Sequence, residues 1–307
     1  MRVAPLICLV GILGLAAPAA AADCPGHPDA LGTSRTLVVD PTEHPRIGSM
    51  QYHETLPLED HEVVLTFDDG PLPPYTTRVL QTLAAQCVKA TYFMIGQQAH
   101  EHPEIVREIQ AAGHTIGTHS QNHPLRFERM PIDKVKAEVE DGIASVTAAL
   151  GDPSEVAPFF RIPGLLRAEG VESYLASKSL MTWSADFVAD DWRHISAGEE
   201  LHRALNRIEA RGKGVLLLHD IQPTTALMLP KLLRELKRRG YRIVQVVPAS
   251  ATQPKTPTTA DQWLSEPRRP AAQLAPAGGA TAPTAQTVGA PASGALPLPD
   301  ATVPINH

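Results

Sequence analysis

The sequence predicts a single α/β domain built on a parallel sheet, open or closed into a barrel, between two atypical chain ends. Three observations support this prediction. Short apolar runs alternate with amphipathic stretches of helical spacing. Polar residues follow several apolar runs directly, as they do where strands of a parallel sheet end. Finally, 307 residues leave room for one large domain once the two ends are set aside.

The first residues have the pattern of a secretory signal peptide. Arg2 precedes a short apolar run that ends in small residues of the Ala-x-Ala type. We expect residues 1–22 to be removed after Ala22, and the protein to be periplasmic or secreted. A buried helix or an uncleaved anchor is the alternative, but the run is short for a membrane span of about 20 residues. No stable membrane span is expected after cleavage.

The cysteines leave two alternatives open. Cys8 would leave with the signal peptide, while Cys24 and Cys87 would reach a compartment that permits disulfides. A disulfide between these two residues is compatible with the sequence. So is an unpaired Cys87 that packs as a small buried hydrophobe.

The mature chain is predicted to have three parts. Residues 23–58 form an N-terminal extension, residues 59–248 the main domain, and residues 249–307 a disordered tail. The tail is rich in Pro, Ala, Thr and Gly without apolar periodicity, so it cannot bury enough surface to offset its ordering entropy. A tether that faces the cell wall is the functional alternative for this segment.

Within the main domain the alternation of patterns predicts individual elements. Buried strands are expected at residues 63–67, 90–94 and 215–218. Amphipathic helices are expected at residues 77–86, 103–112 and 132–150. Pro103 suits a first helical turn and Gly113 a C-terminal stop.

Charge composition excludes one class of partner. The formal net charge is -6 and charged residues make up 20% of the chain, so no basic surface that gathers phosphates is implied. Nucleic acid is therefore not expected as a partner. The oligomeric state is open, and a monomer is expected.

The segment VVLTFDDG places two carboxylates and a glycine at the end of an apolar strand. Adjacent residues that leave a strand point in different directions, so Asp68 and Asp69 can have different roles. One can bind a metal while the other takes a proton from water. A simple turn is the alternative, since Asp-Asp-Gly-Pro is good turn chemistry.

A second segment, AGHTIGTHSQNHP, contains His119 and His123 four residues apart. On one helical turn this spacing would aim both imidazoles at one point, as metal sites need. With one Asp they would form a facial set that leaves positions open for water and substrate. His114 is the competing candidate, and we interpret it as structural or solvent-facing.

Two further segments could support such a site. In FRIPG, Arg161 could hold a carboxylate ionised by paired hydrogen bonds, and Gly164 would leave a backbone amide room beside a substrate oxygen. An ordinary salt bridge is the alternative for Arg161. In VLLLHD, His219 at the tip of an apolar strand could protonate a leaving amine, or it could be a hydrogen-bonded core histidine.

Between these segments lies an acidic stretch framed by Trp183 and Trp192. Tryptophan faces commonly support sugar rings, and a carboxylate beside a histidine raises its pKa and fixes its tautomer. The candidate carboxylates are Asp186, Asp190 and Asp191. Packing alone could explain the tryptophans.

The five segments, in this order, resemble the motifs of the polysaccharide deacetylases, carbohydrate esterase family four with its NodB homology domain, which include chitin, chito-oligosaccharide and peptidoglycan deacetylases. The resemblance covers about Asp60 to Val247, and TFDDG, HSQNHP and LLLHD are its most specific segments. It implies a distorted (β/α) barrel of the polysaccharide deacetylase type with fewer strands than the common eight. Residues 59–248 would be the catalytic domain.

The resemblance also implies a role for each matching residue. Asp68 would be the general base, Asp69, His119 and His123 the metal ligands, Arg161 the partner of Asp68, Asp191 the partner of His219, His219 the general acid, and Trp192 with Leu217 the lining of the acetyl pocket. Two departures concern the substrate groove. Gly164 stands where many members have an aromatic residue. The segment from Asp186 to Trp192 is longer than usual, which leaves the choice among its three aspartates open.

The sequence thus predicts a metal-dependent N-deacetylase that acts on an N-acetylated glycan and releases acetate. Zinc is the first choice of divalent metal ion because two imidazoles and one carboxylate suit it, while cobalt, nickel or iron would also be accepted. Two alternatives remain. One is a non-catalytic carbohydrate-binding or envelope protein on a retired deacetylase scaffold. The other is a metal amidohydrolase of small cyclic amides or imides, against which export argues.

Overall fold

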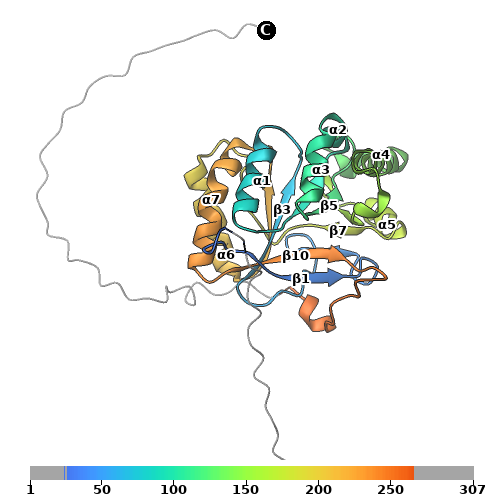
Figure 1. Cartoon of the computed structure of the whole chain (residues 1–307). Coiled ribbons are helices and arrows are strands. Elements are labelled where there is room, and N and C mark those ends of the chain that lie inside the picture. Colours follow the sequence, from blue (N-terminus) through green and yellow to red (C-terminus); the bar gives the residue numbers. More distant parts are fainter. Residues whose placement is uncertain (1–23, 25, 266–307) are drawn as a thin grey trace, which may run out of the picture.

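The protein is described here by a computed structural model of Cys24 and residues 26–265 (Figure 1). The expected signal peptide and residues 266–307 of the expected tail lie outside the described residues. Within the described part, none of the helices combines the length and the hydrophobicity that crossing a bilayer requires.

The strands form a parallel sheet that curves into a distorted barrel with helices outside it (Figure 1). The strands are β1 (Thr33–Val39), β2 (Arg46–Ile47), β3 (Glu62–Asp68), β4 (Thr91–Met94), β5 (Thr115–Thr118), β6 (Phe159–Phe160), β7 (Met181–Trp183), β8 (Phe187–Val188), β9 (Gly214–His219) and β10 (Arg242–Pro248). Their order is β1-β10-β3-β4-β5-β6-β7-β2, and β9 pairs with both β3 and β8. Every strand pair is parallel, so the carboxyl ends gather on one rim.

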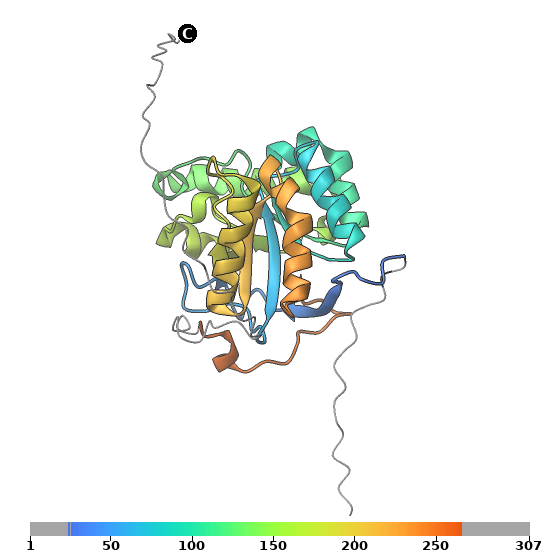
Figure 2. The ribbon, with the colours of Figure 1, turned by 90° about the vertical axis from the view of Figure 1, so that its left-hand side faces the viewer.

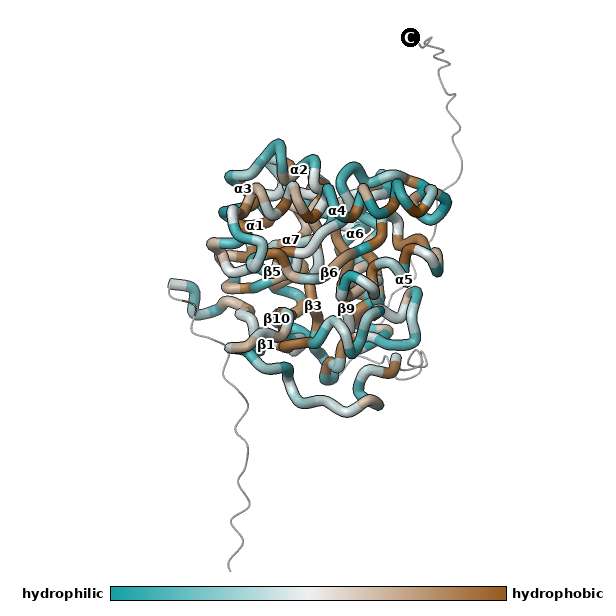
Figure 3. The backbone as a smooth tube through the Cα atoms, turned by 90° about the vertical axis from the view of Figure 1, so that its right-hand side faces the viewer, coloured by the Kyte–Doolittle hydropathy of each residue, from teal (hydrophilic) through white to brown (hydrophobic). Residues whose placement is uncertain are grey.

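Most strands are followed by a helix that returns the chain to the other rim, which is the connection that parallel pairing requires. The helices are α1 (Tyr75–Ala85), α2 (Gly96–Glu101), α3 (Pro103–Ala111), α4 (Ile132–Leu150), α5 (Glu169–Ser177), α6 (Ala197–Arg211) and α7 (Pro223–Arg238). Figure 2 looks onto α6 and α7, with the blue strand β3 visible between them. In Figure 3 the hydrophobic stretches lie along central strands such as β3 and β9, whereas much of α2 and α4 is hydrophilic.

The predicted fold class is confirmed, and the predicted elements lie where their patterns indicated. The three expected strands correspond to β3, β4 and β9, and the three expected helices to α1, α3 and α4. Pro103 begins α3 at its first position, and Gly113 follows its end with a φ of 75°. A left-handed φ at this position suits glycine, which is why the stop could be read from the sequence.

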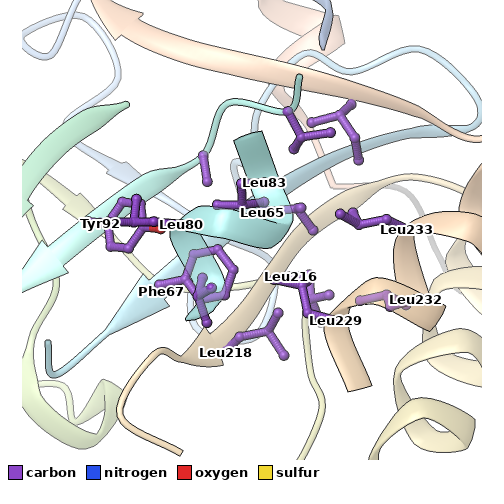
Figure 4. Packing of buried hydrophobic residues seen from close by; sticks show 14 of the residues in the cluster. Leu65, Phe67, Leu80, Leu83, Tyr92, Leu216, Leu218, Leu229, Leu232 and Leu233 are labelled. Carbon is purple, nitrogen blue, oxygen red and sulfur yellow. The ribbon is translucent and has the colours of Figure 1, made fainter. Parts of the chain in front are cut away.

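Alternate residues of β3 face two different hydrophobic layers. Leu65 and Phe67 point outward to α1 and α7, where they pack in the layer shown in Figure 4. Val64 belongs instead to the inner layer of the barrel, with Phe93 and Trp183. Because side chains alternate along a strand, the next residues of even number, Thr66 and Asp68, also face the interior.

The expected N-terminal extension is part of the barrel. Strand β1 pairs with β10 and β2 pairs with β7, while Leu37, Ile47 and Leu56 are buried in the inner layer. The proposed boundary near residue 58 is therefore not a structural division. Strand β2 has only two residues and only the second half of β1 is buried, so neither strand has a strong apolar pattern in the sequence.

Of the two alternatives for the cysteines, the structure has the disulfide. Cys24 bonds to Cys87, with Cα atoms 5.8 Å apart and a sequence separation of 63. A cross-link over a loop of this length removes conformational freedom from the unfolded chain, worth about 4 kcal/mol in the chain-entropy treatment. It attaches the start of the described chain to Cys87, the second residue after the end of α1.

The prediction of disorder from residue 249 onward is wrong for residues 249–265, which we call the C-terminal strap. Thr256 exchanges two hydrogen bonds with the backbone of Val38, and a 3₁₀ turn spans Ala260–Trp263. Trp263 is 3% exposed and stacks on His44 with ring centroids 3.6 Å apart. Composition over a long window underestimates a segment that is held by one large aromatic anchor.

We expect Trp263→Ala to lower the free energy of unfolding by about 3 kcal/mol, because it removes a buried indole from a packed site. Leu264→Ala is the matched control, since Leu264 is 55% exposed and should change stability by no more than about 0.5 kcal/mol. Urea unfolding followed by circular dichroism would measure both. Equal stability of the two variants would show that the strap does not anchor the domain.

Candidate active site

The segments singled out in the sequence meet at the carboxyl rim of the barrel. Asp68 ends β3, His119 follows β5, Arg161 follows β6, and His219 ends β9. Asp191 follows β8 after two residues. Side chains from five distant parts of the chain therefore share one region, as expected for a parallel α/β fold.

Asp69, His119 and His123 form a cluster with the composition and spacing of a metal site. One potential ligand atom from each lies within 4.8 Å of the others. Asp69 Oδ1 is 3.5 Å from His119 Nε2 and 3.6 Å from His123 Nε2. The same Oδ1 is buried and accepts no hydrogen bond within the described structure. A carboxylate oxygen without a partner, facing two imidazole nitrogens, fits a divalent cation between them.

The surroundings of His119 prepare it as a neutral ligand. Its Nδ1–H donates to the carbonyl oxygen of Arg161 at 2.6 Å, which fixes the tautomer and turns Nε2 toward Asp69. Burial is the largest influence on its pKa, which is lowered despite the nearby Asp68 and Asp69. A lowered pKa keeps the ring unprotonated, as metal coordination requires.

The two histidines do not lie on a helical turn, so that part of the prediction is wrong. Residues 119–124 form a loop in which Ser120 and His123 have φ values of 65° and 52°. The His123 N–H donates to Ser120 Oγ, and the imidazole centroids are 4.9 Å apart. A spacing of four residues brings two side chains together on a helix, but a tight loop can do the same.

Helix α4 supports this loop through residues that the sequence reading did not single out. Glu138 accepts hydrogen bonds from the backbone N–H groups of Gln121 and Asn122. Gly142 lets the helix approach closely, since a Cβ there would lie 2.7 Å from the backbone carbon of Ser120. Their only sequence signal is a position on a helix that precedes the third motif, which is too general to identify them.

Asp68 is held from inside the barrel by Arg161. The guanidinium Nη1 donates to Asp68 Oδ1 at 2.6 Å and lies 2.8 Å from Thr66 Oγ1. Its Nη2 donates to the carbonyl oxygen of Ser184, and its Cζ lies 4.2 Å from the centroid of the Phe93 ring. Arg161 is fully buried. Charge-assisted hydrogen bonding of this kind fixes the orientation of the carboxylate.

His219 pairs with Asp191, which resolves the choice among the three aspartates geometrically. The ring Nδ1–H donates to Asp191 Oδ1 at 2.8 Å, and the backbone N–H of His219 donates to Oδ2 at 2.6 Å. Burial would lower the pKa of His219, but the hydrogen bond and charge of Asp191, with smaller contributions from Asp69 and Asp68, raise it to about 9. The other nitrogen, Nε2, lies 3.8 Å from Asp69 Oδ2 and faces the cluster.

The other two aspartates hold the scaffold. Asp186 accepts hydrogen bonds from Ser49, Thr55 and the backbone of Val215, and so fastens the N-terminal segment to β9. Asp190 pairs with two arginines of α6 instead. Neither side chain contacts His219.

The residues expected to line a substrate pocket differ in exposure. Trp192 is 46% exposed and presents an edge contact to His219 at 5.9 Å between ring centroids. Leu217 is buried in a small apolar cluster with Ala185, Val188 and Leu165. Gly164 directly precedes Leu165 and has a φ of 65°, which is strained for other residues.

His114 lies outside the site. It is buried, its Nδ1 accepts a hydrogen bond from the backbone of Ala90, and its ring packs edge-on against Tyr92. Burial, aided by the charge of Lys89, lowers its pKa to about 3. His114 is therefore structural, as expected, and it does not face solvent.

Comparison with known proteins agrees with the motifs. Residues 56–182 match the family described as polysaccharide deacetylase. A peptidoglycan-N-acetylglucosamine deacetylase of Bacillus cereus is 31% identical over 196 residues, which cover 62% of this chain and 89% of that protein. The enzyme of the same name from Listeria monocytogenes is 32% identical over 186 residues, which cover 60% of this chain and only 38% of that longer protein.

A solved structure supports the same relationship. The peptidoglycan deacetylase of Bdellovibrio bacteriovorus superposes with a TM-score of 0.63 at 33% identity, over 71% of this chain and 60% of that chain. The sequence and structure comparisons thus indicate the same family. The region shared with the Bacillus cereus protein covers most of that relative. This chain belongs to the polysaccharide deacetylase family.

Proposed function

We propose that the protein is a metal-dependent N-deacetylase that hydrolyses the acetamide of an N-acetylated glycan to acetate and a free amine. The observation that supports this most directly is the convergence of five side chains around one point. Asp69, His119 and His123 offer ligand atoms to a single cation, Asp68 Oδ2 lies 4.0 Å from His119 Nε2, and His219 Nε2 lies 3.8 Å from Asp69 Oδ2.

A divalent cation bound by Asp69, His119 and His123 would act as a Lewis acid toward the acetyl carbonyl oxygen and would lower the pKa of bound water. Zinc is the proposed ion because the ligand set of two imidazoles and one carboxylate suits it. Cobalt, nickel and iron accept the same ligands.

Asp68 is proposed as the general base. Arg161 binds its Oδ1, and Oδ2 is left to face the cluster, 4.0 Å from His119 Nε2. A carboxylate that is fixed at one oxygen can take a proton from the attacking water at the other without losing its orientation. The charge of Arg161 offsets the burial of the ionised carboxylate.

His219 is proposed as the general acid. Its Nδ1–H is engaged by Asp191, so only Nε2 can transfer a proton, and Nε2 faces the cluster. An amide nitrogen is a poor leaving group unless it is protonated, and the raised pKa of His219 keeps the imidazolium available at neutral pH. Asp191 stabilises the imidazolium of His219 and fixes the orientation of its ring.

The substrate class follows from the family and from the pocket. Trp192 is exposed beside His219, where its ring could support a sugar, while the Leu217 cluster is proposed to receive the acetyl methyl and Gly164 to leave an amide near the oxyanion. Peptidoglycan is the favoured glycan because the related proteins from Bacillus cereus and Bdellovibrio carry that activity in their names. Chitin oligomers and exopolysaccharides are the other candidates.

The remaining features are consistent with work outside the cytoplasm. The disulfide requires an oxidising compartment, and a signal peptide is proposed for residues 1–22. We place the catalytic body at residues 24–265 and leave residues 266–307 as the proposed tail. A non-catalytic protein that only binds glycan would not need to keep the five side chains of the proposed active site in this geometry.

Metal binding provides the first test. We expect His119→Ala to weaken zinc binding at least about 100-fold, because it removes a ligand and leaves two. Isothermal titration of the metal-free protein would measure the affinity. His114→Ala is the matched control, since that buried histidine contacts Ala90 and Tyr92 instead of the cluster. Equal zinc affinity in the two variants would contradict the ligand assignment.

The base provides the second test. Asp68→Asn keeps the shape of the side chain but cannot accept a proton, so acetate release should fall by about 1,000-fold, within the range for general base catalysis. Zinc affinity in the same variant should stay close to that of the wild type, because Asp68 is not among the proposed ligands. Activity within a few-fold of the wild type would overturn the base assignment.

The substrate is tested with a panel of N-acetylated glycans. Acetate release should be measured from peptidoglycan fragments, chitin oligomers and an exopolysaccharide, each with a chelator and again after zinc is restored. We expect release that the chelator abolishes and zinc recovers, with peptidoglycan preferred. Failure to release acetate from every glycan in the zinc-loaded state would rule out the proposed function.

A further inference from the structure

A buried chain of hydrogen bonds continues behind His219 and ends at a second carboxyl group. The hydroxyl of Thr225 lies 2.8 Å from Asp191 Oδ2 and 3.0 Å from Glu200 Oε1. Thr225 and Glu200 are fully buried, and Asp191 is 1% exposed. Thr225 belongs to the first turn of α7 and Glu200 to the first turn of α6, two helices that lie side by side (Figure 2).

The number of available protons limits which of these three groups can donate a hydrogen bond and which must accept one. Asp191 accepts hydrogen bonds from both the ring and the backbone of His219, so it is the ionised member. The hydroxyl of Thr225 has one proton and can donate to only one carboxyl group. If Glu200 were also ionised, two carboxylates would compete for that proton and one would face a lone pair.

A proton on Glu200 satisfies both contacts of the Thr225 hydroxyl, and the second oxygen of Glu200, Oε2, is buried without a hydrogen-bond partner among the described residues, as suits an uncharged acid better than a carboxylate. Glu200 then donates to Thr225 Oγ1, and Thr225 donates to Asp191 Oδ2, so that Asp191 receives three hydrogen bonds. Arg203 and Arg207, which follow Glu200 on α6, form their ion pairs with Asp190.

The electrostatic environment favours the same state. Burial and then the negative charge of Asp191 raise the pKa of Glu200 to about 7, although hydrogen bonds from threonine hydroxyls and the charge of His219 oppose the rise. Two carboxyl groups that share one buried hydroxyl do not both ionise readily. An uncharged Glu200 also avoids adding a second negative charge behind His219.

We propose that Glu200 is kept as a neutral acid and, through Thr225, positions Asp191 and thereby His219 for proton transfer to the leaving amine. Glu200 and Thr225 are positioning residues, because neither contacts the cluster where the reaction would occur. This inference rests on the proposed function in assigning the acid role to His219. The protonation state of Glu200 does not depend on that assignment.

The role in proton donation is tested by comparing two leaving groups in the zinc-loaded enzyme. An amine must be protonated as it leaves, whereas an aryl alkoxide leaves an aryl acetate without protonation. Thr225→Val and Glu200→Met should therefore lower the ratio of glycan deacetylation to aryl acetate hydrolysis by about tenfold or more, mainly through kcat. Thr225→Ser and Glu200→Gln keep a hydroxyl and a neutral donor, so they should recover most of that ratio.

Glu62→Gln serves as the control for loss of a buried carboxyl group. Glu62 is 1% exposed and pairs with Arg35 at the start of β3, at the opposite end of that strand from Asp68. It should leave the ratio unchanged. An unchanged ratio in Thr225→Val and Glu200→Met, with circular dichroism showing both folded, would refute the positioning role.

Infrared spectroscopy tests the protonation state without reference to activity. The difference spectrum between the wild type and Glu200→Gln in mildly acidic buffer should contain the carbonyl band of a protonated carboxylic acid. The difference between the wild type and Glu62→Gln should contain a carboxylate band instead. A carboxylate band for Glu200 would contradict the inference that Glu200 is a neutral acid. If the acid band is present but no glycan is deacetylated, only the proposed function would be contradicted.

Discussion

The buried contact between Arg161 and Asp68 connects the barrel core to the rim where the site lies. A guanidinium with no exposed surface is costly to bury, and several kcal/mol are required for each ion before partners are counted. Here the cost is offset by Asp68, by two other oxygens and by the face of Phe93. Because Arg161 also presents its carbonyl oxygen to His119, one residue orients both the proposed base and a proposed ligand.

Around this centre the side chains are arranged in successive layers, each fixed by the next. The cluster of Asp69, His119 and His123 is held by backbone contacts and by the Glu138 support on α4. His219 is held by Asp191, and Asp191 by Thr225 and Glu200. The outermost of these supports, Glu138, Thr225 and Glu200, come from helices around the barrel, whereas Arg161 and Asp191 follow strands. Helices and strand ends together thus orient the groups of the site, as sites that need pre-organised geometry require.

The sequence predicted the fold class and the reacting groups because both follow strong local patterns. The apolar runs that end in Asp68 and His219 predict two strands, and the polar residues at their ends predict the carboxyl rim of the barrel. The supporting groups have no comparable signal: Glu200 and Thr225 are polar residues in the first turns of helices, where such residues are common for capping alone. The loop geometry at His119 was mistaken for a helical turn, since spacing does not specify dihedral angles. The strap was missed because Trp263 stands alone in a polar stretch.

Pairing of the first strand with the last has a consequence for how the chain reaches its native state. Strand β1 lies between solvent and β10, and their register joins Thr33 to Ile243. Contacts between such distant residues form late, since the intervening chain must be ordered first. A chain exported from its N-terminus would hold β1 without a neighbour until nearly all of the barrel had crossed. The edge of the sheet at β1 can therefore close only after β10, the last strand of the barrel, is available.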